Sequence, residues 1–193
     1  MAVKSNLTNM VLVLGVTCLV CSALLGGAYA ITKEPIEKAV AEKTNRAIAQ
    51  VLPAFSEAEY HADGNYYVAT DDNAQVVGYA IESTTVGFGG NLTLMVGITP
   101  DGVVYNTSVL SQSETPGLGA KCNTDQKFME QWKGFDPASK ILSVKKDGGD
   151  VDAITASTIT SRAYTQAVAN ALDMFKQIAG DAGKDEEGGL SNE

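Results

Sequence analysis

Histidine, tryptophan and cysteine are scarce in this sequence, which has one, one and three of them among its 193 residues. The single histidine, His61, has no other histidine or cysteine close to it in the sequence, so no metal site is expected there. No Ser-His-Asp set and no pair of catalytic carboxylates stands out. This pattern argues against an independent hydrolase or dehydrogenase, and it offers no catalytic residue to name.

Basic residues are also few, with 14 lysines and arginines against 23 aspartates and glutamates and a formal net charge of −9. Nucleic acid is therefore not expected as a partner, because binding a phosphate backbone needs a clustered basic surface. Three cysteines are too few for a disulfide framework. Cys18 and Cys21 lie in an apolar run, where small hydrophobic or helix-interface roles are expected, and Cys122 is expected to be a packed free thiol.

Charge is absent altogether from residues 10–31, which are mostly valine, leucine, alanine and glycine. A helix needs about 20 apolar residues to cross a hydrocarbon core of about 30 Å, so this run predicts a transmembrane anchor preceded by residues 1–9. The alternative is a cleavable signal peptide, because Ala28-Tyr29-Ala30 imitates a cleavage site. The run is longer than the roughly 7–15 apolar residues of such a peptide, which favours an uncleaved anchor.

The remainder of the chain predicts one α+β domain built on an antiparallel sheet. Residues 32–53 form a stalk helix that Pro35 interrupts or starts, and residues 180–193, rich in glycine and acid, form a disordered tail. Between them lies a domain at 54–179, with a hairpin turn at Pro100-Asp101-Gly102. Expected strands are 66–70, 76–83, 92–99, 103–111 and 141–145, and expected helices are 126–133 and 161–178.

Two short segments offer groups that suit a cofactor. Residues 152–158, Asp-Ala-Ile-Thr-Ala-Ser-Thr, combine threonine hydroxyls with small residues just before a helix start, which suits a phosphate. Residues 113–121, Ser-Glu-Thr-Pro-Gly-Leu-Gly-Ala-Lys, form a turn-rich loop with an apolar leucine, which suits a flat ring. The plainer alternatives are an ordinary helix cap at Thr160 or Ser161 and a structural loop with Glu114 and Lys121 solvated.

The first segment resembles the flavinylation motif of the FMN-binding domain family, Asp-x-x-(Ser/Thr)-Gly-Ala-(Ser/Thr), and the second resembles that family's Glu-Thr-Pro-Gly-Leu-Gly loop. The resemblance implies FMN esterified through its phosphate to Thr158. Ala156 stands where the family has glycine and Ser157 where it has alanine, and the former matters if the turn needs a positive φ. Residues 87–90, Gly-Phe-Gly-Gly, are similar to a further glycine-aromatic run of the family.

Length and layout are most similar to the G subunit of the Rnf complex, which moves electrons between ferredoxin and NAD and pumps ions. The resemblance implies a covalent-FMN electron carrier, integral-membrane partner subunits, a separate flavin transferase that cleaves FAD, and a domain on the outer face of the bacterial inner membrane. The alternatives are the C subunit of a sodium-pumping NADH:quinone oxidoreductase and a non-redox anchored binding module. The expected cofactor-binding residues are Glu114, Thr115, Gly117, Leu118, Gly119, Lys121, Asp152, Thr155, Ala156, Ser157, Thr158, Thr160 and Ser161.

Overall fold

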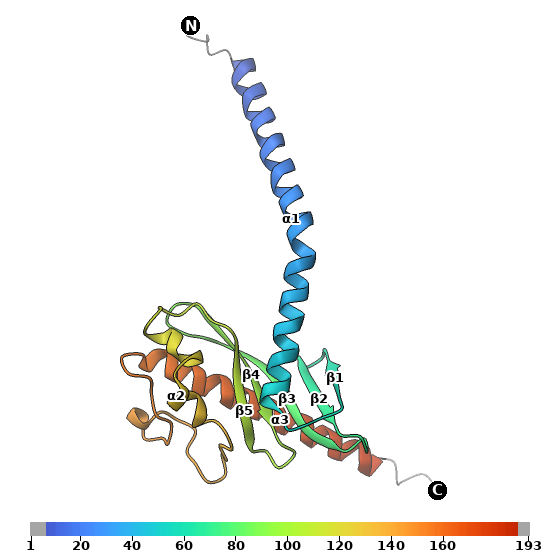
Figure 1. The fold of residues 1–193 in the computed structure, drawn as a ribbon, viewed down its shortest axis with the longest axis vertical. Helices are drawn as coiled ribbons and strands as arrows, with labels where there is room; N and C mark the ends of the chain where they lie inside the picture. The colour runs from blue at the N-terminus through green and yellow to red at the C-terminus, as the bar shows by residue number, and fades with distance from the viewer. Residues whose placement is uncertain (1–6, 189–193) are drawn as a thin grey trace. The chain divides into compact units, whose positions relative to one another are not determined.

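A computed structural model describes residues 7–188 of the chain (Figure 1). The chain divides into two compact units, Met1–Lys43 and Thr44–Glu193. Helix α1 (Leu7–Val51) begins in the first unit and ends in the second.

Helix α1 contains a window apolar enough to cross a membrane, and none of that window is buried by other parts of the protein. Side chains such as Leu12 and Leu24 are 62% and 69% exposed. A row of exposed leucines and valines of this length is unfavourable in water and favourable in hydrocarbon. The length and composition of α1 are therefore those of a membrane anchor.

Pro35 lies inside α1, so the expectation that it interrupts or starts a helix is wrong. A proline removes the hydrogen bond that its own N–H would have donated one turn back, but the neighbouring turns can hold the helix together. Here two ion pairs spaced four residues apart bracket the proline, Glu34 with Lys38 at 2.7 Å and Lys33 with Glu37 at 3.8 Å. Pairs at this spacing favour continued helix.

The second unit contains a five-stranded antiparallel sheet whose strands lie side by side in chain order, which confirms the α+β prediction. The strands are β1 (Glu57–His61), β2 (Tyr66–Thr70), β3 (Val76–Val86), β4 (Asn91–Ile98) and β5 (Val104–Ser111). The hairpin predicted between β4 and β5 is present, closed by the Thr99 N–H donating to the Val103 carbonyl at 2.9 Å.

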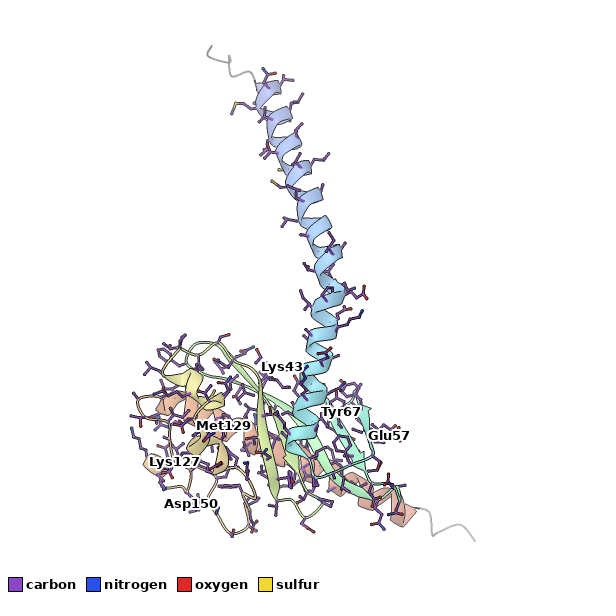
Figure 2. The ribbon with its side chains drawn as sticks, in the orientation of Figure 1. Lys43, Glu57, Tyr67, Lys127, Met129 and Asp150 are labelled. Carbon is purple, nitrogen blue, oxygen red and sulfur yellow. The ribbon has the colours of Figure 1, made fainter. Side chains whose placement is uncertain are left out.

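Strand β1 was not predicted, because its mixture of acid, alanine and aromatic residues shows no apolar alternation. It lies at the edge of the sheet and pairs with the neighbouring β2, with Glu57 opposite Thr70 and Tyr60 opposite Tyr67; Figure 2 labels Glu57 on β1 and Tyr67 on β2. An edge strand needs apolar side chains on few positions, since much of it faces solvent.

Both faces of the sheet are covered by apolar side chains. One face packs against helix α3 (Thr158–Gly188), which contacts β3 and β4. The alternating β4 residues Leu92, Leu94, Val96 and Ile98 belong to this core. The predicted core residues of the closing helix, Tyr164, Val168, Ala171, Leu172 and Phe175, are all buried there.

The opposite face forms a smaller core that includes the last turns of α1. Ala47, Ile48 and Val51 pack there with Met95 of β4, so the expectation that the stalk packs on the domain is confirmed for these turns. Burying a valine or isoleucine side chain stabilises the fold by about 1.5–3 kcal/mol. The end of α1 is thus an integral part of the domain.

Two further expectations about secondary structure need correction here. Residues 141–145 form no strand but an irregular segment with one parallel bridge, Val144 to Val151, followed by the 3₁₀ helix η2 (Lys145–Asp147). Gly148, at φ +84°, turns the chain back before a ladder can extend. Helix α2 (Gln126–Glu130) is shorter than the expected 126–133.

Helix α3 begins at Thr158, three residues before the expected start, and it continues to Gly188. The disordered tail expected from residue 180 is therefore helical as far as 188, and residues 189–193 lie outside the described residues. Alanine, lysine and glutamate in this stretch are good helix formers, so an established helix can propagate through them.

Candidate cofactor site

Three segments that lie far apart in the sequence meet around one cavity of about 350 Å³. They are the Gly-Phe-Gly-Gly turn after β3, the loop after β5 and the start of α3. The lining residues are Phe88, Glu114, Thr115, Leu118, Gly119, Ala156, Ser157, Thr158, Ile159 and Thr160. The structure therefore brings the two predicted motif segments together and adds Phe88 and Ile159 to them.

The buried carboxylate of Glu114 joins all three segments. Its Oε1 accepts hydrogen bonds from the backbone N–H groups of Phe88 and Gly89, at 2.8 and 3.2 Å. Its Oε2 accepts a hydrogen bond from the Thr160 hydroxyl at 2.6 Å. With only 6% of the residue exposed, Glu114 is a structural cross-link and not a solvated loop residue.

The cross-link requires glycine at Gly119. A β-carbon there would lie 2.4 Å from Glu114 Oε2 and 2.6 Å from Thr160 Oγ1, closer than any real contact. Gly87 has the same restriction, with Glu114 Oε1 2.1 Å from its would-be β-carbon. The glycines of both loops thus let backbone approach the carboxylate closely, which the glycine-rich composition alone did not show.

Ser157 precedes the first turn of α3 and anchors it. The Ser157 carbonyl accepts from both the N–H and the hydroxyl of Ser161, at 3.0 and 2.9 Å, and the Ser161 hydroxyl in turn accepts from the Ile154 N–H at 2.9 Å. Ser161 is fully buried and does not line the cavity. The expectation that it binds the cofactor directly is not supported, because its polar groups already serve the backbone.

The helix start that faces the cavity is formed instead by Thr158, Ile159 and Thr160. The first N–H groups of a helix have no acceptor within it and carry a partial positive charge. Because these three residues line the cavity, this end of it suits an anion such as a phosphate.

Ala156 has a left-handed backbone conformation, with φ at +61°. A left-handed conformation costs a residue with a β-carbon about 1–2 kcal/mol and costs glycine almost nothing. The family motif has glycine at this position, and the structure gives the physical reason. In this chain the strained position is occupied by alanine, the smallest residue that has a β-carbon.

Thr158 is partly exposed at the cavity, and its hydroxyl has one partner that the motif did not reveal. The ammonium group of Lys146, in η2, donates to Thr158 Oγ1 at 3.1 Å. Sequence reasoning missed Lys146 because it follows directly on the segment that was expected to be a strand. Nothing in its local sequence distinguishes it from Lys145 beside it.

Asp152 does not line the cavity, although it belongs to the motif. Its carboxylate forms an ion pair with Lys145 at 2.8 Å, and its backbone N–H donates to Gln131 Oε1 at 2.7 Å. The hydrogen bond from Lys145 lowers the pKa of the Asp152 carboxyl. Its side chain therefore serves an ion pair outside the cavity.

The other predicted residues lie close to the cavity without lining it. Thr155, Gly117 and Lys121 are exposed. Gly117, at φ +76°, belongs to a turn closed by the Leu118 N–H donating to the Thr115 carbonyl at 3.1 Å, as the turn signal predicted. Lys121 follows in the 3₁₀ helix η1 (Gly119–Asn123).

The cavity has the two kinds of surface that an FMN needs. Phe88, Leu118 and Ile159 are 68%, 44% and 51% exposed and supply apolar surface for a flat ring. The start of α3 and the ammonium of Lys146 supply donors and positive charge for a phosphate. The residues present therefore fit this group.

Comparison with known proteins agrees with this geometry. Residues 87–173, which include every segment of the cavity, match the FMN-binding domain family. The G subunit of an ion-translocating oxidoreductase complex from Methanosarcina acetivorans is 33% identical, with 90% of this chain and 96% of that protein covered. The G subunit of the proton-translocating ferredoxin:NAD(+) oxidoreductase complex from Clostridium ljungdahlii is 31% identical, with 93% of each covered.

Among solved structures, the C subunit of the Na(+)-translocating NADH-quinone reductase from Parabacteroides distasonis is 26% identical over 59% of this chain and 61% of that chain, with a TM-score of 0.45. The identity and coverage of the two G-subunit relatives decide the assignment. The chain carries an FMN-binding domain and belongs to the family formed by the G subunits of ion-translocating oxidoreductase complexes.

Proposed function

We propose that this protein is a membrane-anchored electron-transfer subunit with FMN bound covalently to Thr158, working in a ferredoxin:NAD oxidoreductase complex of the Rnf type. The observation that carries the proposal is the meeting of the two motif segments and Phe88 around one cavity, with the Thr158 hydroxyl at its helix-start end. The names of the two relatives support the choice of complex. The protein is a carrier within the complex and not an independent catalyst.

The residues of the cavity divide the work of holding the cofactor. Bound FMN supplies the transfer of electrons one or two at a time. The N–H groups at the start of α3 would hold the phosphate end, next to Thr158. Phe88, Leu118 and Ile159 would contact the ring and exclude water from it, and Glu114 holds the three segments together.

Covalent attachment requires a donor and a second protein. A flavin transferase would bring FAD to the partly exposed Thr158, whose Oγ would form a bond to the phosphorus of the FMN half. The bond from that phosphorus to the oxygen that bridges the two phosphates would break, AMP would leave, and the transferase would accept the hydroxyl proton. The oxidation state of the flavin does not change in this step.

The proposed location is the bacterial inner membrane, crossed once by residues 10–31, with residues 1–9 in the cytoplasm and the domain at 54–179 on the outer face. One helix cannot itself carry electrons across about 30 Å of hydrocarbon, so neighbouring integral subunits must supply a redox centre. Small residues in the span, Gly15, Gly26 and Gly27, leave room for close helix packing with such subunits.

The test is to produce the full chain together with a flavin transferase and to locate the adduct by peptide mass spectrometry. A phosphoester-linked FMN on Thr158 is expected, with Thr158→Ser still modified and Thr158→Ala unmodified. Thr155→Ala is the matched control, because Thr155 is an exposed motif hydroxyl outside the cavity and its loss leaves the adduct in place.

Other results would overturn the assignment. A flavin on Thr155, Ser157 or Thr160 would show that the register is wrong. A denatured, desalted protein without yellow colour would remove the electron carrier and leave the anchored binding module.

A further inference from the structure

The 3₁₀ helix η2 is tied to the motif and to α3 by each of its three consecutive side chains. All three side chains are charged. Two of them contact an oppositely charged partner, and the third, Lys146, contacts a neutral hydroxyl. The contacts are Lys145 to Asp152 at 2.8 Å, Lys146 to Thr158 Oγ1 at 3.1 Å, and Asp147 to Arg162 through two bonds of 2.7 Å each.

The two outer ties fix the position of the residue between them. Arg162 donates through Nε and one terminal nitrogen to the two carboxylate oxygens of Asp147, a fork geometry that sets orientation as well as distance. The same bonds lower the pKa of the Asp147 carboxyl, which keeps it ionised. Exposed ion pairs such as these contribute little to the free energy of folding. Their role here is to orient the η2 backbone against α3.

Lys146 is thereby held beside Thr158, which lines the cavity, without an ion-pair partner among the described residues. Within residues 7–180, the Lys146 ammonium donates a hydrogen bond to a neutral hydroxyl and forms no ion pair. The neutral hydroxyl does not neutralise the positive potential of the ammonium and of the helix start, although the adjacent Asp147 carboxylate, which pairs with Arg162, offsets part of the Lys146 charge.

We propose that Lys146 pairs with the phosphate of FMN once that phosphate is esterified to Thr158, and that it positions the phosphate against the first turn of α3. The inference rests on the proposed function. Esterification turns Thr158 Oγ into a bridging oxygen and places non-bridging oxygens with one negative charge beside it. The Lys146 ammonium, 3.1 Å from Oγ and carried on a flexible stem, reaches those oxygens by a small rotation.

Lys146 is therefore a positioning residue and touches no reacting atom of the ring. Before attachment, its charge attracts the phosphates of the incoming FAD toward the Thr158 hydroxyl. After attachment, its ion pair exists only in the flavin-bearing protein, so it raises the stability of that form above that of the flavin-free form.

The experiment compares the full chain with Lys146→Gln, Lys146→Arg and Lys133→Gln, each supplied with FAD and a flavin transferase. Lys133 is the matched control, an exposed lysine outside the cavity. Covalent incorporation is followed by intact mass. We expect Lys146→Gln to slow it about tenfold, as the loss of a charged hydrogen bond predicts, and Lys146→Arg and Lys133→Gln to stay near the rate of the unaltered chain.

The second readout is the urea midpoint with and without flavin. For the unaltered chain and Lys133→Gln, the attached flavin should raise the midpoint by an equal amount, and for Lys146→Gln by less. A slower rate with an unchanged rise in midpoint would show that Lys146 acts on the transferase, which overturns the phosphate pairing. An unchanged rate and rise would also overturn it. A failure of the unaltered chain to take any flavin would overturn the proposed function itself.

Discussion

Ala156 is strained because its turn requires a φ of +61°, where a β-carbon is unfavourable. We predict that Ala156→Gly raises the free energy of unfolding. Relief of about 1–2 kcal/mol of strain exceeds the roughly 0.4–1 kcal/mol that glycine adds to the entropy of the unfolded chain, leaving a net gain of about 0.5–1 kcal/mol.

Urea unfolding of the flavin-free protein measures this gain, and Ala138→Gly is its control. Ala138 is an exposed alanine in a turn whose φ is not positive, so glycine there brings no relief of strain and only a loss of stability. Equal effects of the two substitutions would contradict the strain at Ala156.

Cys122 is a buried thiol close to the buried Glu114 carboxylate. Burial first, and the charge of Glu114 second, raise the pKa of the Cys122 thiol from 9.0 to about 11. In the unfolded chain the thiol loses its proton at the lower pH, so between about pH 9 and pH 11 the unfolded state binds fewer protons than the folded state. Stability must therefore fall as pH rises through this window.

We predict that Cys122 contributes about 1–2 kcal/mol to that alkaline loss of stability. The measurement is the urea midpoint of the unaltered chain and of Cys122→Ala at pH 8 and at about pH 10.5. The alanine variant should lose less stability over this interval. Identical losses would show that other groups, such as the buried Tyr164, account for the whole effect.

At the scale of elements, the loop after β5 and the start of α3 are two walls of one cavity, and we assign the ring to the loop wall. Leu118 presents apolar surface there. We predict that Leu118→Asp shifts the flavin absorption spectrum and lowers the flavin midpoint potential, because a carboxylate near the ring disfavours the added electron. Attachment at Thr158 should persist, since the helix start is unchanged.

The control for added charge is Asn170→Asp, which adds the same charge to an exposed position on α3 outside the cavity. Spectrum and potential are measured on protein that carries flavin. If Leu118→Asp and Asn170→Asp behave alike, the ring does not lie against the loop.

Element boundaries show where sequence patterns were sufficient. The strand at 66–70, the β4–β5 hairpin and the apolar stripe of α3 follow from alternation, turn residues and helical spacing, each of which is a local property. The segment at 141–145 has the composition of a strand but no neighbouring strand to pair with, so it became the irregular lead into η2. Strand pairing depends on contacts with distant segments of the chain, which local composition does not reveal.

At the scale of the whole molecule, the apolar window of α1 is the proposed link between the domain and its complex. We predict that residues 10–31 remain attached in the mature protein and hold the domain on the outer face of the membrane. Protease added to intact cells without their outer membrane should digest the domain, and the intact mass should include the span.

A cytoplasmic protein of the same cells serves as the control and must survive the protease. Protection of the domain, or a mature N-terminus at Ile31, would contradict the anchored and exported arrangement.

The sequence by itself determined the apolar span, the antiparallel α+β class and the motif residues Thr158 and Glu114, because hydropathy, alternation and short motifs are written in neighbouring residues. Tertiary structure alone decided that Glu114 is a buried cross-link, that Ser161 serves the backbone and not the cavity, and that Lys146 lies at the Thr158 hydroxyl. Each of these depends on contacts between segments that are separate in the chain. Such contacts form only when the sheet and α3 have packed and the loops have closed around them.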